Sequence, residues 1–504
     1  MSLKKNVIAN YLGQGWTALM GIAFVPLYIE YLGMEAYGLI GVFAILQAWL
    51  TLLDMGMTPT LSREMARYTA GAHTAQSIRD LLRSLEVICF AIASVCGVVI
   101  WLASAWLATH WLQAERLPVE EVAQAISVIG LVVALRFVES LYRGAILGLQ
   151  KHVLFNVVNA LLATLRGVGV LGVLAWISPT IEAFFIWQGI VSILAIATLA
   201  AVAYRHLPSP EIPPSFSRNA LKEVWQFARG MMAITFLSLL LMQTDKVLLS
   251  GLLSLESFGY YTLAASVCGV LYLLVAPIAQ SFSPRFTELV AQGEIGVLTN
   301  TYHQAAQLVA VLVVPAALVL IFFGETLLVV WTGNASLAHE AGPLVALLAI
   351  GWMFNALMNP PYMLQIAYGW TSFAVWMNVI AVVLLVPAIL FITPRYGAVG
   401  AASVWAVLNA SYVLIAIHFM HRRLLEEEKW RWYLHDIFFP FISAAGIVTV
   451  SWMVHPLALN KMSEAAWLVA TGTAALGAST MAAPLLRVRI FKWIKNRGNS
   501  DHAA

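Results

Sequence analysis

Apolar windows of about 20 residues recur along almost the whole chain, and this repetition constrains the fold more than any other feature. A helix of this length spans the hydrocarbon core of a bilayer. Because that core offers no water, each backbone polar group must be satisfied within its own segment, so such windows fold as helices. The sequence therefore predicts an all-α integral membrane protein with about 14 transmembrane helices.

Composition agrees with this prediction. Of the 504 residues, 61% are hydrophobic and 11% are charged, and the mean hydropathy is +0.83. These values lie outside those of soluble proteins.

Two adjacent prolines in MNPPYMLQ (Met358 to Gln365) are expected to kink or break the tenth helix. The expected spans are approximately residues 6–29, 37–62, 82–108, 122–147, 152–177, 182–204, 224–251, 257–282, 302–323, 340–366, 371–392, 398–420, 435–454 and 465–485.

Lys and Arg are distributed unevenly between the two sets of loops, which predicts the orientation. Of the 28 cations, the loops on one side hold only Arg116, Arg395 and Lys461. Three more lie within predicted helices, namely Arg136, Arg166 and Lys246. All the others fall in loops or helix ends on the opposite side, which is therefore expected to be cytoplasmic, with both termini. No small-residue cleavage site follows the first helix, so it is expected to remain in the protein and not to be a signal peptide.

The net charge of +3 and the position of the three cysteines bear on the partners and on disulfide formation. Most cations lie in loops, and the sequence shows no nucleic-acid-binding pattern. Cys89, Cys96 and Cys268 all fall inside apolar segments, so we expect no disulfide. The sequence contains no metal-binding cluster, nucleotide-binding loop or catalytic triad, and we expect neither a cofactor nor an enzymatic activity.

Two stretches of the chain resemble each other. Tyr31 to Ala44 aligns with Leu252 to Ala265 at an offset of 221, which equals six helices. An even offset predicts two parallel six-helix lobes related by a pseudo-twofold axis along the membrane normal, with the substrate path between them. The matched pairs are Leu32/Leu253, Glu35/Glu256, Gly38/Gly259 and Ala44/Ala265.

This repeat predicts four parts. Residues 1–205 form an N-lobe of helices 1–6, and residues 206–222 form a Pro/Ser-rich cytoplasmic linker. Residues 223–420 form a C-lobe of helices 7–12. Residues 421–504 add two C-terminal helices and a cytoplasmic tail.

Three motifs indicate a family. They are N-Y-x14-P-L-x4-LG-x3-YG from Asn10 to Gly38, LLDMGM from Leu52 to Met57, and TDKVLLSGLLSLESFGYYTLA from Thr244 to Ala264. Together they resemble the polysaccharide-biosynthesis flippases, the O-antigen-type lipid-linked oligosaccharide translocases of the multidrug/oligosaccharidyl-lipid/polysaccharide exporter superfamily. The resemblance extends to about residue 420.

The resemblance implies a multi-pass protein of the bacterial inner membrane that moves undecaprenyl-diphosphate-linked oligosaccharide, such as an O-antigen unit of lipopolysaccharide, to the periplasmic leaflet by alternating access. Its partners would be that glycan, membrane lipids, and a polymerase and chain-length proteins of the same pathway. Related flippases carry a cationic cavity between their lobes, but at no fixed motif, so its residues must be sought in this chain.

Charges in the membrane are the first candidates, since a charge at the bilayer centre costs at least about 2.5 kcal/mol and is kept for a partner, a cavity or a ligand. Arg166 has no acid within four positions on its helix and is expected to face a cavity and bind diphosphate, or else to pair with an acid on a neighbouring helix. In ALRFVESLYRG, Arg136 and Glu139 share one helix face. Arg136 is expected to bind substrate, to neutralise Glu139, or to do both.

Asp54 is the carboxylate best placed for a proton-linked coupling role, although a buried, capped acid is the alternative. Asp245 and Lys246 lie in the outer third of the seventh helix. We expect Asp245 and Glu139 to act in coupling or gating. Lys246 is expected to contact the head group or to meet Asp54 in a lock between the lobes.

The first helix carries a polar stripe that includes Asn10 and Gln14. Such a stripe suits a glycan-facing cavity wall, although hydrogen bonding between helices gives the same pattern. Two other functions stay open. A cation-coupled multidrug exporter of the same superfamily would favour an acidic cavity. A membrane glycan polymerase or glycosyltransferase would need a catalytic carboxylate near the outer face or a large periplasmic loop, and the longest outer loop here is at about residues 109–121.

Overall fold

The protein is helical throughout the part that the structure, a computed structural model, describes. That part comprises residues 3–54, 56–69, 71–208, 212–218, 221–222, 236, 239–240, 242–456 and 459–489, with side chains from residue 12 onward except Thr51. Within it, extended pairing is limited to one parallel bridge between Gln113 and Ser254. The chain divides into two compact units, Met1–Gly259 and Tyr260–Ala504.

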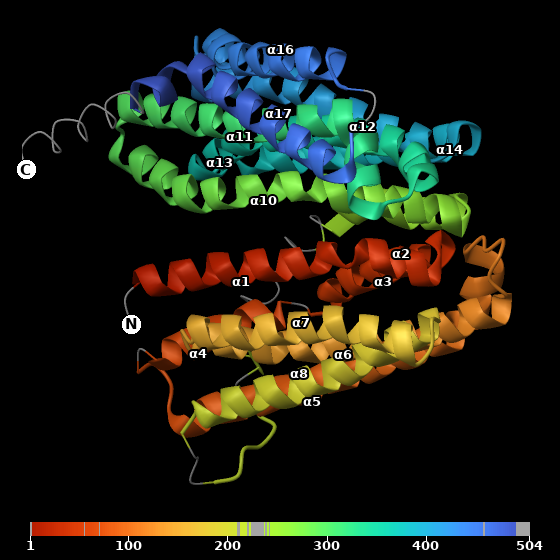
Figure 1. Ribbon diagram of the computed structural model, residues 1–504. Helices are drawn as coiled ribbons and strands as arrows, with labels where there is room; N and C mark the ends of the chain where they lie inside the picture. Colours follow the sequence, from red (N-terminus) through yellow and green to blue (C-terminus); the bar gives the residue numbers. More distant parts are fainter. Residues whose placement is uncertain are drawn as a thin grey trace, which may run out of the picture. The chain divides into compact units, whose positions relative to one another are not determined.

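The first unit is built around one buried helix (Figure 1). Its elements are α1 (Leu3–Ala23), α2 (Val25–Leu32), α3 (Met34–Leu53), α4 (Met57–Thr69), α5 (Ala75–Trp106), the π-helix η1 (Leu107–Trp111), α6 (Val119–Gly148), α7 (His152–Trp176), α8 (Ile181–Arg205) and the start of α10 (Leu255–Gln292). α6 packs against α3, α4, α5 and α8, and α7 packs against α1 and α8.

The sequence of α6 explains its central position. Val122, Ile126, Ile129, Val133 and Phe137 recur every three or four residues and are all buried. This spacing places them on one face of a helix, where they pack on the neighbouring helices. The polar residues of the same helix, Arg136 and Glu139 among them, are thereby fixed in a densely packed environment.

The second unit is also built around one helix, α11 (Ile295–Thr332), which packs against α12, α16 and α17. The remaining elements are α12 (Ala335–Leu357), α13 (Asn359–Ala367), α14 (Thr371–Leu424), α15 (Lys429–Arg431), the π-helix η2 (Trp432–Phe438), α16 (Phe439–Met453) and α17 (Lys461–Ala482). In Figure 1 the added C-terminal helices α16 and α17 lie along α11. The division at residues 206–222 stays a prediction, because much of residues 219–241 lies outside the described part.

The predicted fold class is confirmed: eleven helices in the described residues are long and apolar enough to cross a membrane. The number fourteen stays a prediction. α14 contains 54 residues and changes direction at Gly397, whose φ of 59° and ψ of −149° are not helical, so it covers two of the expected spans. The predicted break at MNPPYMLQ is confirmed, since α12 ends at Leu357 and α13 begins at Asn359.

One expected span is wrong as a single helix. Residues 37–62 are divided into α3 and α4 by a turn at Asp54 and Gly56, where Gly56 has a φ of 74°. This left-handed conformation costs a glycine little but would strain most other residues. The window is apolar as expected, but the LLDMGM segment (Leu52 to Met57) divides it into two helices.

Candidate functional site

Arg166 and Glu139 form an ion pair between α7 and α6. The Arg166 guanidinium donates to the Glu139 carboxylate at 2.6 Å, and each side chain is 15% exposed. Arg166 is therefore paired with an acid on a neighbouring helix, which was one of its two expected environments. Glu139 forms its ion pair with Arg166 on α7, and no ion pair joins it to Arg136 within the described residues. That Arg136 binds substrate, neutralises Glu139 or does both stays a prediction.

Arg136 is held by neutral groups. Its guanidinium donates to the side-chain oxygens of Gln47 on α3, at 3.1 Å, and of Gln188 on α8, at 2.9 Å. It also lies over the ring of Phe43, 5.1 Å from the centroid, a favourable cation–π contact. The sequence analysis did not single out either glutamine, since each lies far from Arg136 in the chain.

Arg136, Glu139 and Arg166, which we call the arginine cluster, lie in the interior of α6 and α7, away from the helix ends. Arg136 is roughly 18 Å and Arg166 roughly 21 Å along its helix from the predicted cytoplasmic end, at 1.5 Å per residue. Two cations face one carboxylate, so the cluster carries one excess positive charge. The Nε–H of each arginine is buried and has no hydrogen-bond partner among the described residues. The cluster can therefore accept a further anionic or hydrogen-bonding group.

Asp54 lies in the turn between α3 and α4 and caps α4. Its carboxylate accepts hydrogen bonds from the Thr58 backbone N–H at 3.1 Å and from the Thr58 hydroxyl at 2.7 Å. A carboxylate at a helix N-terminus is stabilised by the helix dipole. The Thr58 hydroxyl lies 3.4 Å from that of Ser140, the residue after Glu139, so this turn adjoins the arginine cluster.

The other predicted site residues within the described part have environments of their own. Gln14 is exposed on α1, and the side chain of Asn10 lies outside the described residues. Lys246 reaches Gln243 at 3.5 Å, whereas Asp54 is engaged by Thr58, so the expected contact between Lys246 and Asp54 is not formed. Asp245 is buried.

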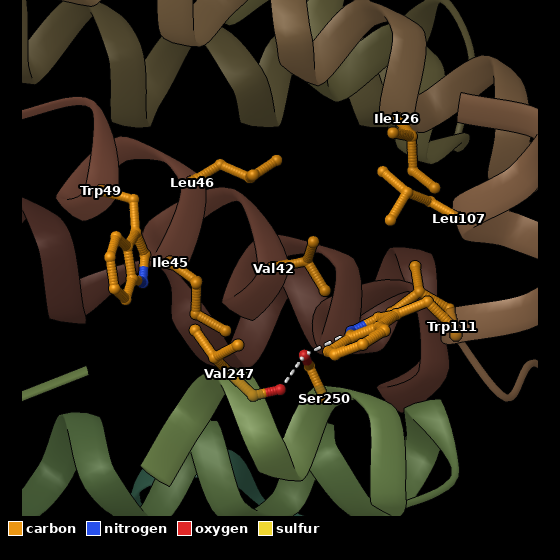
Figure 2. A pocket seen from close by; sticks show the side chains of 10 residues that line it. Val42, Ile45, Leu46, Trp49, Leu107, Trp111, Ile126, Val247 and Ser250 are labelled. Carbon is orange, nitrogen blue, oxygen red and sulfur yellow. Dashed lines mark hydrogen bonds between the residues drawn. The ribbon is translucent and has the colours of Figure 1, made fainter. Parts of the chain in front are cut away.

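An apolar cavity of about 250 Å³ lies near the predicted outer ends of these helices. In Figure 2, Val42, Ile45, Leu46 and Trp49 of α3 line it together with Val247 and Ser250 of the helical segment 242–252. The Trp111 indole donates to the Ser250 hydroxyl at 3.0 Å at its edge. No charged side chain lines this cavity, so it is unsuited to a diphosphate.

The first turns of α3 and α10 meet in a reciprocal contact. A Cβ added at Gly38 would overlap the carbonyl oxygen of Leu255, and one added at Gly259 would overlap that of Met34. Met34 and Leu255, like Gly38 and Gly259, are separated by the repeat offset of 221. Reciprocal contacts of this kind are what a local two-fold relation produces. The glycine match predicted from the repeat thus has a structural reason.

The loop between η1 and α6 strengthens this contact. The Glu35 carboxylate accepts hydrogen bonds from three consecutive backbone N–H groups, those of Glu115 (2.5 Å), Arg116 (2.9 Å) and Leu117 (3.1 Å). Arg116 in turn pairs with Glu256, the repeat equivalent of Glu35, at 3.1 Å. Gln113 accepts from the Leu255 N–H at 2.8 Å. We call these residues the outer contact.

Sequence reasoning missed several buried ionisable groups. Glu86 accepts from the hydroxyls of Tyr142 and Tyr204, and Glu64 pairs with Arg67 and His73. In the second unit, the two ring nitrogens of His303 face the carboxylates of Asp436 and Glu428. Arg67 lies three residues after Glu64 on α4, whereas the partners of Glu86 and His303 are distant in sequence. The sequence marks such a group only as a polar residue in an apolar window, which does not identify the residue that it pairs with.

Comparison of the sequence with known proteins identifies a family. Residues 3–290 match the family model described as "Polysaccharide biosynthesis protein". A Shigella flexneri protein described as "Putative O-antigen transporter" is 20% identical over 409 residues, which cover 81% of this chain and 95% of that protein.

Two solved structures show the fold. The lipid II flippase MurJ in its inward closed conformation superposes with a TM-score of 0.67 at 11% identity, over 94% of this chain and 98% of that one. An inward-facing multidrug resistance MATE family transporter of the MOP superfamily gives 0.61 at 12% identity, over 84% and 95%. Since the family model covers more than half of the residues, this chain belongs to the polysaccharide biosynthesis protein family of membrane transporters.

Proposed function

We propose that this protein moves oligosaccharide linked to undecaprenyl diphosphate from the cytoplasmic to the periplasmic leaflet of a bacterial inner membrane. The observation that supports this most directly is the excess positive charge of the arginine cluster at mid-depth. A diphosphate is anionic and cannot cross about 30 Å of hydrocarbon unaided. A guanidinium remains charged when desolvated and can bind two phosphate oxygens at once.

The two arginines have different roles in this proposal. Arg136 donates to the neutral amide oxygens of Gln47 and Gln188 and forms no ion pair within the described residues, so its charge is available to the diphosphate without displacing an acid. Arg166 must exchange Glu139 for a phosphate oxygen. That exchange links substrate binding to a change in the α6–α7 pair. Asp54, which adjoins Ser140 through Thr58, is the acid proposed to couple transport to an ion.

Alternating access requires that the outer contact breaks and re-forms in each cycle. The bridge between Gln113 and Ser254 offers a direct test, since Cα atoms paired across such a bridge are within reach of a disulfide. The variant Gln113→Cys with Ser254→Cys, in a chain with Cys89, Cys96 and Cys268 replaced by Ala, should form a disulfide under oxidation. Glycan export should then stop, lipid-linked glycan should accumulate in the inner leaflet, and a reductant should restore export.

Each single cysteine variant serves as the control and should export under both conditions. Undiminished export with the disulfide fully formed would contradict alternating access through the outer contact.

The competing function is a multidrug exporter with cation coupling. It predicts that deletion of the gene leaves glycan export unchanged and makes cells sensitive to cationic drugs. An excess cation at mid-depth is poorly suited to such substrates.

A further inference from the structure

A second cavity, which is polar, lies at the predicted cytoplasmic end of α14 and apart from the arginine cluster. It has a volume of about 510 Å³ and is lined by Trp370, Phe373, Phe419, Arg422, Arg423 and Glu426. It forms because the break at Gly397 brings the two ends of α14 together. Phe373 near the start of the helix contacts Phe419 near its end, with ring centroids 6.4 Å apart.

Two arginines and one glutamate, Glu426, line this cavity, so its charged side chains leave one excess positive charge. Arg422 and Arg423 are exposed, and neither forms an ion pair within the described part of the chain. The Arg423 guanidinium lies 4.3 Å from the centroid of the Trp370 ring, which itself stacks on Phe373 at 4.5 Å. This aromatic shelf fixes the plane of the guanidinium while its N–H groups stay free to bind an anion.

The surface beside the cavity is apolar. Phe419 is 50% exposed, and Trp376 and Ile415, on the two arms of α14, are 66% and 49% exposed. Arg422 and Arg423 belong to the last turn of this apolar helix, the position at which Arg and Trp meet lipid head groups. A ligand that contacts both the arginines of the cavity and the apolar surface beside it must combine an anionic head with an apolar body.

We propose that this cavity binds the phosphate head group of an anionic phospholipid of the cytoplasmic leaflet. Arg422 and Arg423 contact the phosphate, and the acyl chains lie along Phe419, Ile415 and Trp376. Basic sites at the cytoplasmic face of membrane helices recognise such head groups. The exposed apolar side chains beside the cavity suit the acyl chains of a resident phospholipid.

The test uses the purified full-length protein in detergent and native mass spectrometry. Dioctanoyl phosphatidylglycerol should bind more tightly than dioctanoyl phosphatidylcholine, which carries no net charge. Arg422→Ala with Arg423→Ala should weaken phosphatidylglycerol binding about tenfold or more, because two charge-assisted contacts are lost. Trp370→Leu, which keeps both charges and removes the shelf, should weaken it less.

Arg143→Ala with Lys151→Ala is the matched control. It removes the same charge from the same predicted side without touching the cavity, and it should leave binding unchanged. Equal phosphatidylglycerol binding by the wild type and the Arg422/Arg423 variant would overturn the proposal. An equal loss in the control pair would also overturn it, since binding would then follow net charge. Undecaprenyl diphosphate that displaces phosphatidylglycerol at equimolar concentration would overturn it as well and assign the site to the cargo.

Discussion

At the residue scale, Arg136 and Arg166 lie at a similar depth but have different partners. Arg166 forms an ion pair with Glu139, whereas Arg136 donates to two amide oxygens and lies over an aromatic ring. Removing one member of a buried ion pair leaves an uncompensated charge, whereas removing both does not. The pairing of Glu139 with Arg166 therefore determines which double substitution separates folding from transport.

We expect Arg166→Ala to destabilise the protein by roughly 3 kcal/mol, since Glu139 is then left without its partner. Arg166→Ala with Glu139→Gln should recover most of that loss in thermal unfolding in detergent. If Arg166 also binds diphosphate, glycan export by this stable double variant should remain abolished. Glu139→Gln alone is the control for the loss of the acid. Wild-type export by the double variant would show that Arg166 serves only to neutralise Glu139.

At the element scale, the outer contact depends on the close approach of α3 and α10. Gly38 and Gly259 permit this approach because neither has a Cβ. Around them, Glu35 and Glu256 are bound by the same short loop, through backbone N–H groups in one case and through Arg116 in the other. A contact made by equivalent residues predicts that equivalent substitutions have equivalent effects.

Gly38→Ala and Gly259→Ala should each separate the two helices, because the added methyl group would overlap a backbone carbonyl that cannot move aside. Each change should slow disulfide formation between cysteines at positions 113 and 254, and the two should do so to a similar degree. Gly269→Ala is the matched control on α10, since a Cβ there meets nothing within 4 Å. An effect confined to one of the two glycines, or matched by Gly269→Ala, would refute the two-fold interpretation.

At the scale of the whole molecule, the charge bias and the helix count depend on each other. One helix more or fewer would reverse the side assigned to every later loop. The eleven candidate spans of the described residues agree with the expected windows, and the apolar α3 and the break at Gly397 account for two more. Of the expected seventh span, the structure describes residues 236, 239–240 and 242–251.

Reporter fusions test this topology directly. Fusions after Arg218 and Arg431 should read cytoplasmic, and a fusion near Glu115 should read periplasmic, because Lys and Arg accumulate on the side that is not translocated. Alkaline phosphatase and green fluorescent protein, fused at the same positions, serve as complementary reporters. A periplasmic reading after Arg431 would exclude an even number of helices before that point and with it the fourteen-helix topology.

The sequence by itself determined the properties that depend on local composition and spacing. Apolar windows determined the membrane-spanning helices, because burying backbone polar groups in hydrocarbon leaves few alternatives. The repeat identified Glu35, Gly38, Glu256 and Gly259 from sequence alone. The two prolines after Asn359 predicted the break between α12 and α13, because proline removes a backbone donor.

Only the tertiary structure decided which charged groups meet. Spacing placed Arg136 and Glu139 on one face of α6, yet Glu139 pairs with Arg166 on α7, and Gln47 and Gln188 hold Arg136 from α3 and α8. A helical period specifies the direction of a side chain from its own axis, whereas its partner depends on how neighbouring helices pack. The cavity at Arg422 and Arg423 has the same origin, since a single break at Gly397 brings residues about fifty positions apart together.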